Sequence, residues 1–159
     1  MTDTIVRQRC VVLTFPATGS MSDLLCGLQP NQVFSPRERR LGLRRGSPAS
    51  WAGWLAAKAA VLAVLGVPVP AGPSPPSAEL PWVNVEILPD GDGLCAEPST
   101  CRRSHRPAAT SHPPVAGLLG AGERLAVSIS HSAVTALALA ARVATVECGG
   151  AREAVDGAR

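Results

Sequence analysis

The segment from Ser47 to Gly66 constrains the fold more than any other part of the chain, because it predicts one long, alanine-rich helix. Ser47 suits the N-cap, and Pro48 suits the first helical position, where no backbone donor is required. Gly66 and the following Pro68 end the helix. Apolar side chains recur at helical spacing at Trp51, Trp54, Leu55, Leu62 and Leu65.

Lys58, in the middle of this segment, is the only lysine of the chain, and the other basic residues are all arginine. Two interpretations remain open on spacing alone. The side chain extends along a half-buried helix to reach water, or it has a role in binding or catalysis.

Composition favours one domain over residues 1–148, with a disordered tail over 149–159. Hydrophobic residues make up 46% of the chain, but it has two Phe, three Trp and no Tyr, so we expect an aliphatic core. A net charge of +3 without a concentrated basic stripe argues against nucleic acid as a partner. The chain has five cysteines but no CxxC pair, and it shows neither a signal-peptide pattern nor an apolar run of membrane length. These features predict a cytoplasmic protein with reduced thiols.

The rest of the chain mixes strand and helix patterns. Strands are predicted at 5–15, 82–88, 94–97 and 124–131, while 132–146 fits either a helix or a strand. Short helices are predicted within 20–29 and from Ser35, where Pro36 and Glu38 complete a capping box. Residues 98–114 lack periodicity and predict a long flexible loop, in which His105 and His112 are solvated.

The most basic part of the chain follows this second helix start. Its arginines are Arg37, Arg39, Arg40, Arg44 and Arg45. One interpretation is a solvated helix face. The other is a binding surface for phosphate or for an acidic protein.

Three segments, in this order, resemble motifs of the phosphopantetheinyl transferase superfamily, of the small holo-acyl-carrier-protein synthase type. Phe34 to Glu38 is similar to F-T-x-x-E, and Trp54 to Gly66 is similar to R-F-A-A-K-E-A-x-x-K-A-L-G. Val127 to Ser132 is similar to V-S-[IL]-S-H-[ST]. Between them, 83–88 resembles the family's I-E-V-L strand, so that the resemblance extends over about residues 5–147.

The resemblance implies an α+β fold in which a long helix packs on an antiparallel sheet. It implies a homotrimer that binds coenzyme A (CoA) between subunits and transfers 4′-phosphopantetheine to a serine of an acyl carrier protein, with magnesium held by carboxylates. It also implies that Lys58, Ser128, Ser130 and His131 contact the cofactor. The arginine cluster would then dock the acidic carrier protein.

The departures from the family fall on its charged positions. Ala59 stands where the family has its metal-binding glutamate, Ala63 where it has a second lysine, and Trp54 where it has arginine. The first strand, at Cys10 to Thr14, lacks the family's second metal-binding carboxylate. Losing either a metal site or a phosphate-clamping cation costs about three or more decades of rate. We therefore expect no metal ligands and little metal-dependent transfer.

Three hypotheses follow. In the first, the fold recognises CoA or a phosphopantetheine-bearing carrier in fatty-acid or polyketide-type biosynthesis, repurposed as a cyclase, dehydratase or isomerase. His131 would then be the acid–base group, with Lys58 polarising a carbonyl or holding a phosphate, and Glu86 and Asp90 as weaker candidates. In the second, the chain is a working magnesium-dependent synthase with ligands among Asp23, Glu38 and Glu86. In the third, it is a non-catalytic partner that docks a carrier protein.

Overall fold

The structure is a computed structural model of the chain, and it describes residues 2–17, 19–45, 47–69, 78–90 and 106–146. The strands are β1 (Thr2–Thr14), β2 (Val85–Pro89), β3 (Pro107–Ser111), β4 (Glu123–His131) and β5 (Thr135–Val146). The α-helices are α1 (Met21–Leu25), α2 (Pro30–Val33), α3 (Pro36–Arg45) and α4 (Pro48–Val64). Two short 3-10 helices are η1 (Trp82–Asn84) and η2 (Val115–Leu118).

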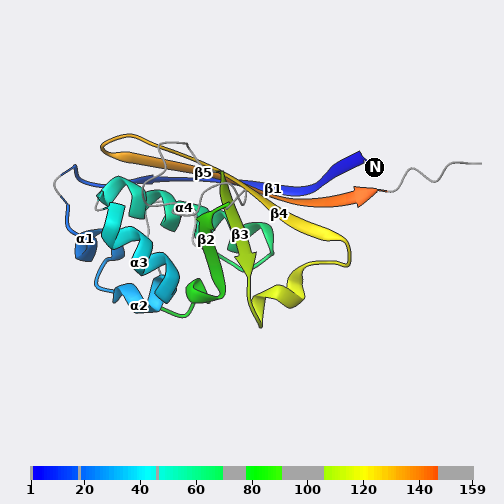
Figure 1. Cartoon of the computed structure of the whole chain (residues 1–159), viewed down its shortest axis with the longest axis horizontal. Helices are drawn as coiled ribbons and strands as arrows, with labels where there is room; N and C mark the ends of the chain where they lie inside the picture. The colour runs from blue at the N-terminus through cyan, green and yellow to red at the C-terminus, as the bar shows by residue number, and fades with distance from the viewer. Residues whose placement is uncertain (1, 18, 46, 70–77, 91–105, 147–159) are drawn as a thin grey trace, which may run out of the picture.

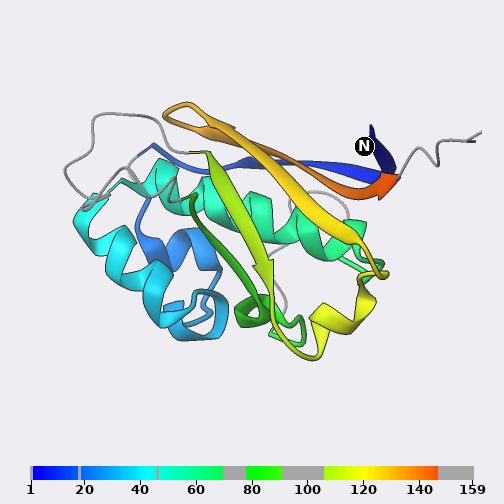
Figure 2. The same cartoon turned by 45° about the vertical axis from the view of Figure 1, so that its right-hand side comes forward.

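An antiparallel sheet with the strand order β1-β5-β4 forms one layer, and α4 runs beneath it (Figure 1). The pair β2-β3 lies on another side of α4, and α1, α2 and α3 gather near its N-terminal end (Figure 2). The predicted α+β class, with a long helix packed on an antiparallel sheet, is therefore confirmed.

Helix α4 begins at Pro48, as predicted, but it is buried on every side rather than along one stripe. All residues from Trp51 to Leu62 are buried, since the sheet covers one side of the helix while β2 and the short helices cover the others. An apolar helix of this kind belongs in the centre of a core. Alanines let the helix approach the sheet closely, and Gly53 does the same. A Cβ on Gly53 would lie 2.9 Å from Cγ2 of Ile129 in β4.

Residues 132–146, for which the sequence left helix and strand open, contribute the central strand β5. Its side chains alternate between the two faces of the sheet, as in any strand. Ala136, Ala138 and Ala140 are fully buried against α4, while Leu137 and Leu139 on the other face are about 40% exposed. Pairing with a strand on each side therefore outweighs the local helix preference of alanine.

The predicted loop over 98–114 is wrong for residues 107–111, which form β3 and pair antiparallel with β2. This pairing is non-local, so the periodicity of 98–114 alone does not reveal it. The strand predicted over 82–88 begins only at Val85, because Trp82–Asn84 form η1. The predicted strand at 94–97, His105 and the tail at 149–159 lie outside the described residues.

Candidate functional site

The Lys58 ammonium is completely buried within the core and is paired with the equally buried carboxylate of Glu38. Nζ lies 2.8 Å from Oε2 of Glu38 and donates to the backbone carbonyls of Trp82, at 3.0 Å, and Val85. The ammonium also lies 5.6 Å from the centre of the Phe34 ring. All three of its N–H donors thus have acceptors within the protein.

Glu38 is held by the capping box that the sequence predicts at the start of α3. The Ser35 backbone N–H donates to Oε2 of Glu38 at 2.7 Å, and the Glu38 N–H donates to the Ser35 hydroxyl at 3.2 Å. In addition, the backbone N–H of Ile87 donates to Oε1 at 2.7 Å. The carboxylate is therefore fully engaged by protein donors.

Together, Glu38 and Lys58 form hydrogen bonds with the backbone groups along the edge of β2 that faces away from β3. Alternate residues of a strand direct their backbone groups to the same edge. Here the Ile87 N–H meets Glu38, and the Val85 carbonyl meets Lys58. A buried ion pair thus takes the place of a neighbouring strand at an edge that would otherwise leave polar groups unsatisfied.

Burial dominates the electrostatics of this pair. It raises the pKa of Glu38, against the lowering effect of the nearby Lys58 ammonium and the donated hydrogen bonds. It lowers the pKa of Lys58, against the raising effect of Glu38 and, more weakly, of Glu86. Each partner therefore offsets part of the effect that burial has on the pKa of the other, as in other buried ion pairs.

The carboxylate of Glu86 extends this network toward the surface. The Ser35 hydroxyl donates to its Oε1 at 2.5 Å, and Arg37 donates to its Oε2 at 3.2 Å. Glu86 is 5% exposed, whereas the Arg37 side chain is 67% exposed. Glu86 was a weaker acid–base candidate, and both of its oxygens are occupied. Asp90, the other weaker candidate, is exposed beyond the end of β2.

This placement bears directly on the roles predicted for Lys58. A side chain with no exposed surface does not reach solvent, so the interpretation of a lysine extended toward water is wrong. An ammonium with three protein acceptors also has no donor left for a phosphate or a carbonyl. The arrangement favours a structural role for Lys58, and its predicted catalytic and cofactor-binding roles would require these bonds to break.

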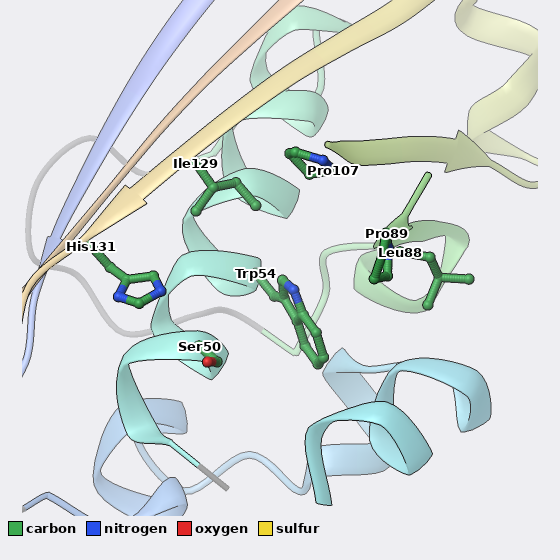
Figure 3. Close-up of a pocket in the computed structure, with 7 residues that line it drawn as sticks. All are labelled: Ser50, Trp54, Leu88, Pro89, Pro107, Ile129 and His131. Atoms are coloured by element: carbon green, nitrogen blue, oxygen red, sulfur yellow. The ribbon is translucent and has the colours of Figure 1, made fainter. Parts of the chain in front are cut away.

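His131 lies at a separate site, a cavity of about 180 Å³ between α4, the end of β4 and the strands β2 and β3. Figure 3 shows His131 directed from β4 toward α4, with Ser50 near it and the Trp54 indole in the centre. The lining residues are Ser50, Trp54, Leu88, Pro89, Pro107, Ile129 and His131. We call this cavity the His131 pocket.

Trp54 is fixed in this pocket by an aromatic cluster that the sequence analysis did not single out. Its ring centre lies 5.2 Å from that of Trp51 and 6.4 Å from that of Phe34. The predicted helical spacing places Trp51 and Trp54 near one another, but it does not reveal Phe34. The pocket residues Leu88, Pro89 and Pro107 were also missed, because they meet only through the β2-β3 pairing.

Ser128 and Ser130 lie on the other face of the sheet from the His131 pocket. In β4 they alternate with Ile129 and His131, and they pair with the exposed Leu139 and Leu137 of β5. The structure therefore does not bring the two predicted cofactor-binding serines together with His131 around one cavity of a single chain.

The arginine cluster lies on α3, close to the network of Glu86. Arg37 and Arg40 are exposed. Arg39 is partly buried, and its Nε lacks a hydrogen-bond partner. Arg44 and Arg45 continue α3, but their side chains lie outside the described part of the structure.

The carboxylates proposed as replacement magnesium ligands do not fit that role. Glu38 and Glu86 are engaged as described above, and Asp23 forms the capping box of α1 with Ser20. Ala59, at the family's glutamate position, is buried in α4. Within the described ranges, no group of three His, Cys, Asp or Glu side chains lies in a position to hold a metal ion. No described helix is long and apolar enough to span a membrane.

Solved structures of other proteins share this arrangement of helices and strands. An ACPS–CoA complex from Chronobacterium ammoniagenes superposes with a TM-score of 0.63 and 25% identity, covering 92% of this chain and 100% of that chain. An apo ACPS structure from the same organism gives a TM-score of 0.59 and 26% identity, covering 91% and 100%.

A more distant likeness extends to a holo-(acyl-carrier-protein) synthase of Bacillus anthracis in complex with CoA (3′,5′-ADP). Its TM-score is 0.55 at 18% identity, covering 89% of this chain and 98% of that one, and it bears on the fold alone. No family model and no curated protein matches the sequence. The predicted resemblance to the holo-acyl-carrier-protein synthase type of the phosphopantetheinyl transferase superfamily is confirmed by the solved structures.

Proposed function

We propose that this chain binds CoA, or the phosphopantetheine arm of an acyl carrier protein, and that the His131 pocket is part of the binding site. The observation that carries the proposal is a cavity at the junction of α4 and β4, within a fold shared with an ACPS–CoA complex over 92% of the chain. The setting would be fatty-acid or polyketide-type biosynthesis.

The chemistry that suits these residues is acid–base catalysis on a carrier-bound or CoA-bound chain, as in a cyclase, dehydratase or isomerase. An imidazole is the natural group for it, because its unperturbed pKa is near neutrality. His131 lines the pocket, and Ser50 lies beside it (Figure 3). Lys58 supports this site from the core, by holding β2 against α4 through Glu38, Val85 and Trp82.

The fold likeness to ACPS structures also favours a second candidate, a working magnesium-dependent holo-acyl-carrier-protein synthase. This candidate needs carboxylate ligands for the metal. Those that the sequence offered are bound to Lys58, Arg37, Ser35, Ser20 and backbone N–H groups. We therefore rank it below the metal-independent function.

Carrier-protein docking is assigned to the exposed side of α3. Arg37 and Arg40 present positive charge there, while Arg39 is partly buried. Acidic surfaces recognise such clusters through steering and charge-assisted hydrogen bonds. If the chain has lost catalysis altogether, this surface is what a non-catalytic carrier-binding partner would retain.

We further infer that the chain assembles with copies of itself, as the family resemblance implies, through the outer face of the β1-β5-β4 sheet. This face exposes Val12, Leu137 and Leu139 at 40–56%. The three residues are adjacent, since Val12 pairs with Leu137 and Leu139 lies two residues farther along β5. An exposed apolar patch marks an interaction surface. Ser128 and Ser130 share it, so any contact they make with CoA would occur at a subunit interface.

Isothermal titration of the protein with CoA tests the proposed binding. We expect saturable binding without magnesium, weakened at least tenfold by His131→Ala. The matched control is His112→Ala, an exposed histidine outside the pocket, which should leave binding unchanged. If CoA and a holo carrier protein both fail to bind at millimolar concentration, the proposed function is wrong.

A further inference from the structure

We propose that Gly53 is a positioning residue for His131: by presenting no side chain at one point of α4, it lets the His131 imidazole lie against the helix. This inference rests on the proposed function and adds to it the residue that sets the orientation of the imidazole. It depends on three observations, namely the single glycine within α4, the two β4 side chains that lie over it, and the hairpin that follows His131.

Gly53 is the only glycine within α4, and it lies in the interior of the helix. Glycine is less favourable there than alanine, because its backbone loses more conformational freedom on folding. Alanine is accepted at other buried points of the same helix, where Ala52, Ala56 and Ala60 have no exposed surface. Glycine at position 53 therefore calls for a local reason.

That reason lies in β4, which passes directly over Gly53. A Cβ on Gly53 would lie 2.9 Å from Cγ2 of Ile129 and 3.6 Å from Cδ2 of His131. Two carbon atoms in contact prefer about 3.5–4.0 Å, so the added atom would push Ile129 away from α4. Ile129 and His131 are two residues apart and project from the same face of the strand. The space over Gly53 thus serves both side chains.

The hairpin between β4 and β5 links the position of His131 to that of Ile129. His131 pairs with Ala136, and the Ser132 N–H donates to the Thr135 carbonyl at 2.8 Å. The Ser132 hydroxyl accepts in turn from the Thr135 N–H at 3.1 Å. Because this tight turn follows His131 directly, a shift of β4 at Ile129 carries His131 with it.

The contact with α4 also determines what lies beside the imidazole. Ser50 and Gly53 are three residues apart and therefore neighbours on one face of the helix, and Figure 3 shows Ser50 near His131. His131 as a whole is exposed, so the contact leaves ring surface open to a ligand. An acid–base group must lie within hydrogen-bond reach of the atom that it serves. A displaced imidazole would lose that reach in a chain that is still folded.

Gly53→Ala tests the inference, and it keeps α4 intact because alanine favours a helix more than glycine does. The chain has three histidines, so the imidazole NMR spectrum holds few signals, and His131→Ala identifies that of His131. We expect Gly53→Ala to shift this signal and to weaken CoA binding by about threefold or more, but not by more than His131→Ala does. The matched control is Gly117→Ala in η2, where no described atom lies within 4 Å of the added Cβ. It should change neither the signal nor the affinity.

A double-mutant cycle with Ile129→Ala tests the cause of the change. Ile129→Ala removes the Cγ2 atom, so adding Gly53→Ala to it should shift the His131 signal much less. If the two shifts are equal, or if Gly53→Ala leaves either the signal or the CoA affinity at the value of Gly117→Ala, the inference is wrong and CoA binding stands. If the original protein binds neither CoA nor a holo carrier protein, the proposed function itself is wrong.

Discussion

Replacing Lys58 with methionine is the perturbation whose outcome the structure defines most sharply. Methionine keeps the length and apolar character of the stem but removes the ammonium. The change leaves the Glu38 carboxylate without the Lys58 cation, and it removes the ammonium that donates to the carbonyls of Trp82 and Val85. Breaking a buried pair from one side costs about 3–5 kcal/mol.

The expected loss of unfolding free energy is large for a chain of this size. Single domains unfold with a free energy of about 5–15 kcal/mol, so a cost of about 3–5 kcal/mol removes at least about a fifth of that stability. Each kcal/mol corresponds to about 2–4 °C in the midpoint of thermal unfolding at this length. Urea unfolding followed by circular dichroism measures the difference. Arg40→Met, which removes an exposed cation from α3, is the matched control and should cost at most about 0.5 kcal/mol.

The pH dependence of the variants distinguishes a buried pair from a general packing defect. Without Lys58, the pKa of Glu38 rises further, because burial is no longer opposed by the ammonium. A carboxyl group with a raised pKa binds more protons in the folded state. Its contribution to stability is full below the unfolded pKa of about 4.5 and is lost as the pH rises. The defect of Lys58→Met should therefore be smaller at pH 4.5 than at pH 7.

Glu38→Gln should show the opposite slope. Its Lys58 then has a pKa lowered further by unopposed burial, so that the unfolded state binds more protons and stability rises toward alkaline pH. If Lys58→Met costs less than 1 kcal/mol, or if both variants show the same pH slope, the buried-pair account of Lys58 is refuted.

Three further predictions concern packing, docking and assembly. A Cβ on Gly42 would overlap the Trp51 ring, so Gly42→Ala should cost about 1–3 kcal/mol in urea unfolding, and an unchanged midpoint would contradict the packing described here. Arg40→Glu should weaken binding of an acyl carrier protein and flatten its salt dependence in titrations from 50 to 300 mM salt; equal affinities would exclude α3 as the docking surface. Leu139→Lys should turn an oligomer into a monomer in analytical ultracentrifugation, and an unchanged mass would exclude the outer sheet face as the interface.

Local signals in the sequence predicted much of the fold. Proline and serine at the helix starts specified α4 and α3, and the Ser35–Glu38 capping box formed as expected. Strand β5 remained ambiguous because its alanines favour a helix until two neighbouring strands are present. Strand β3 was missed because its partner β2 lies across an intervening segment that carries no periodic signal.

The candidate site was less predictable, because burial is a tertiary property. The sequence singled out Lys58 but gave no means of knowing that Glu38 and the edge of β2 would surround it. It also grouped His131 with Ser128 and Ser130, although neighbouring residues of a strand point to opposite faces. Because side chains alternate between the two faces of a strand, the sequence of 128–131 already places both serines on the face opposite to His131.

Intact-protein mass spectrometry of an apo acyl carrier protein tests the central claim most directly, namely that the fold serves recognition without metal-dependent transfer. The carrier is incubated with CoA, magnesium and this protein, beside a parallel titration of CoA binding. The account predicts that CoA binds while the carrier gains no phosphopantetheine mass. A phosphopantetheine mass gain at a catalytic rate would contradict it, and would mean that a working metal site is assembled from carboxylates other than Asp23, Glu38 and Glu86.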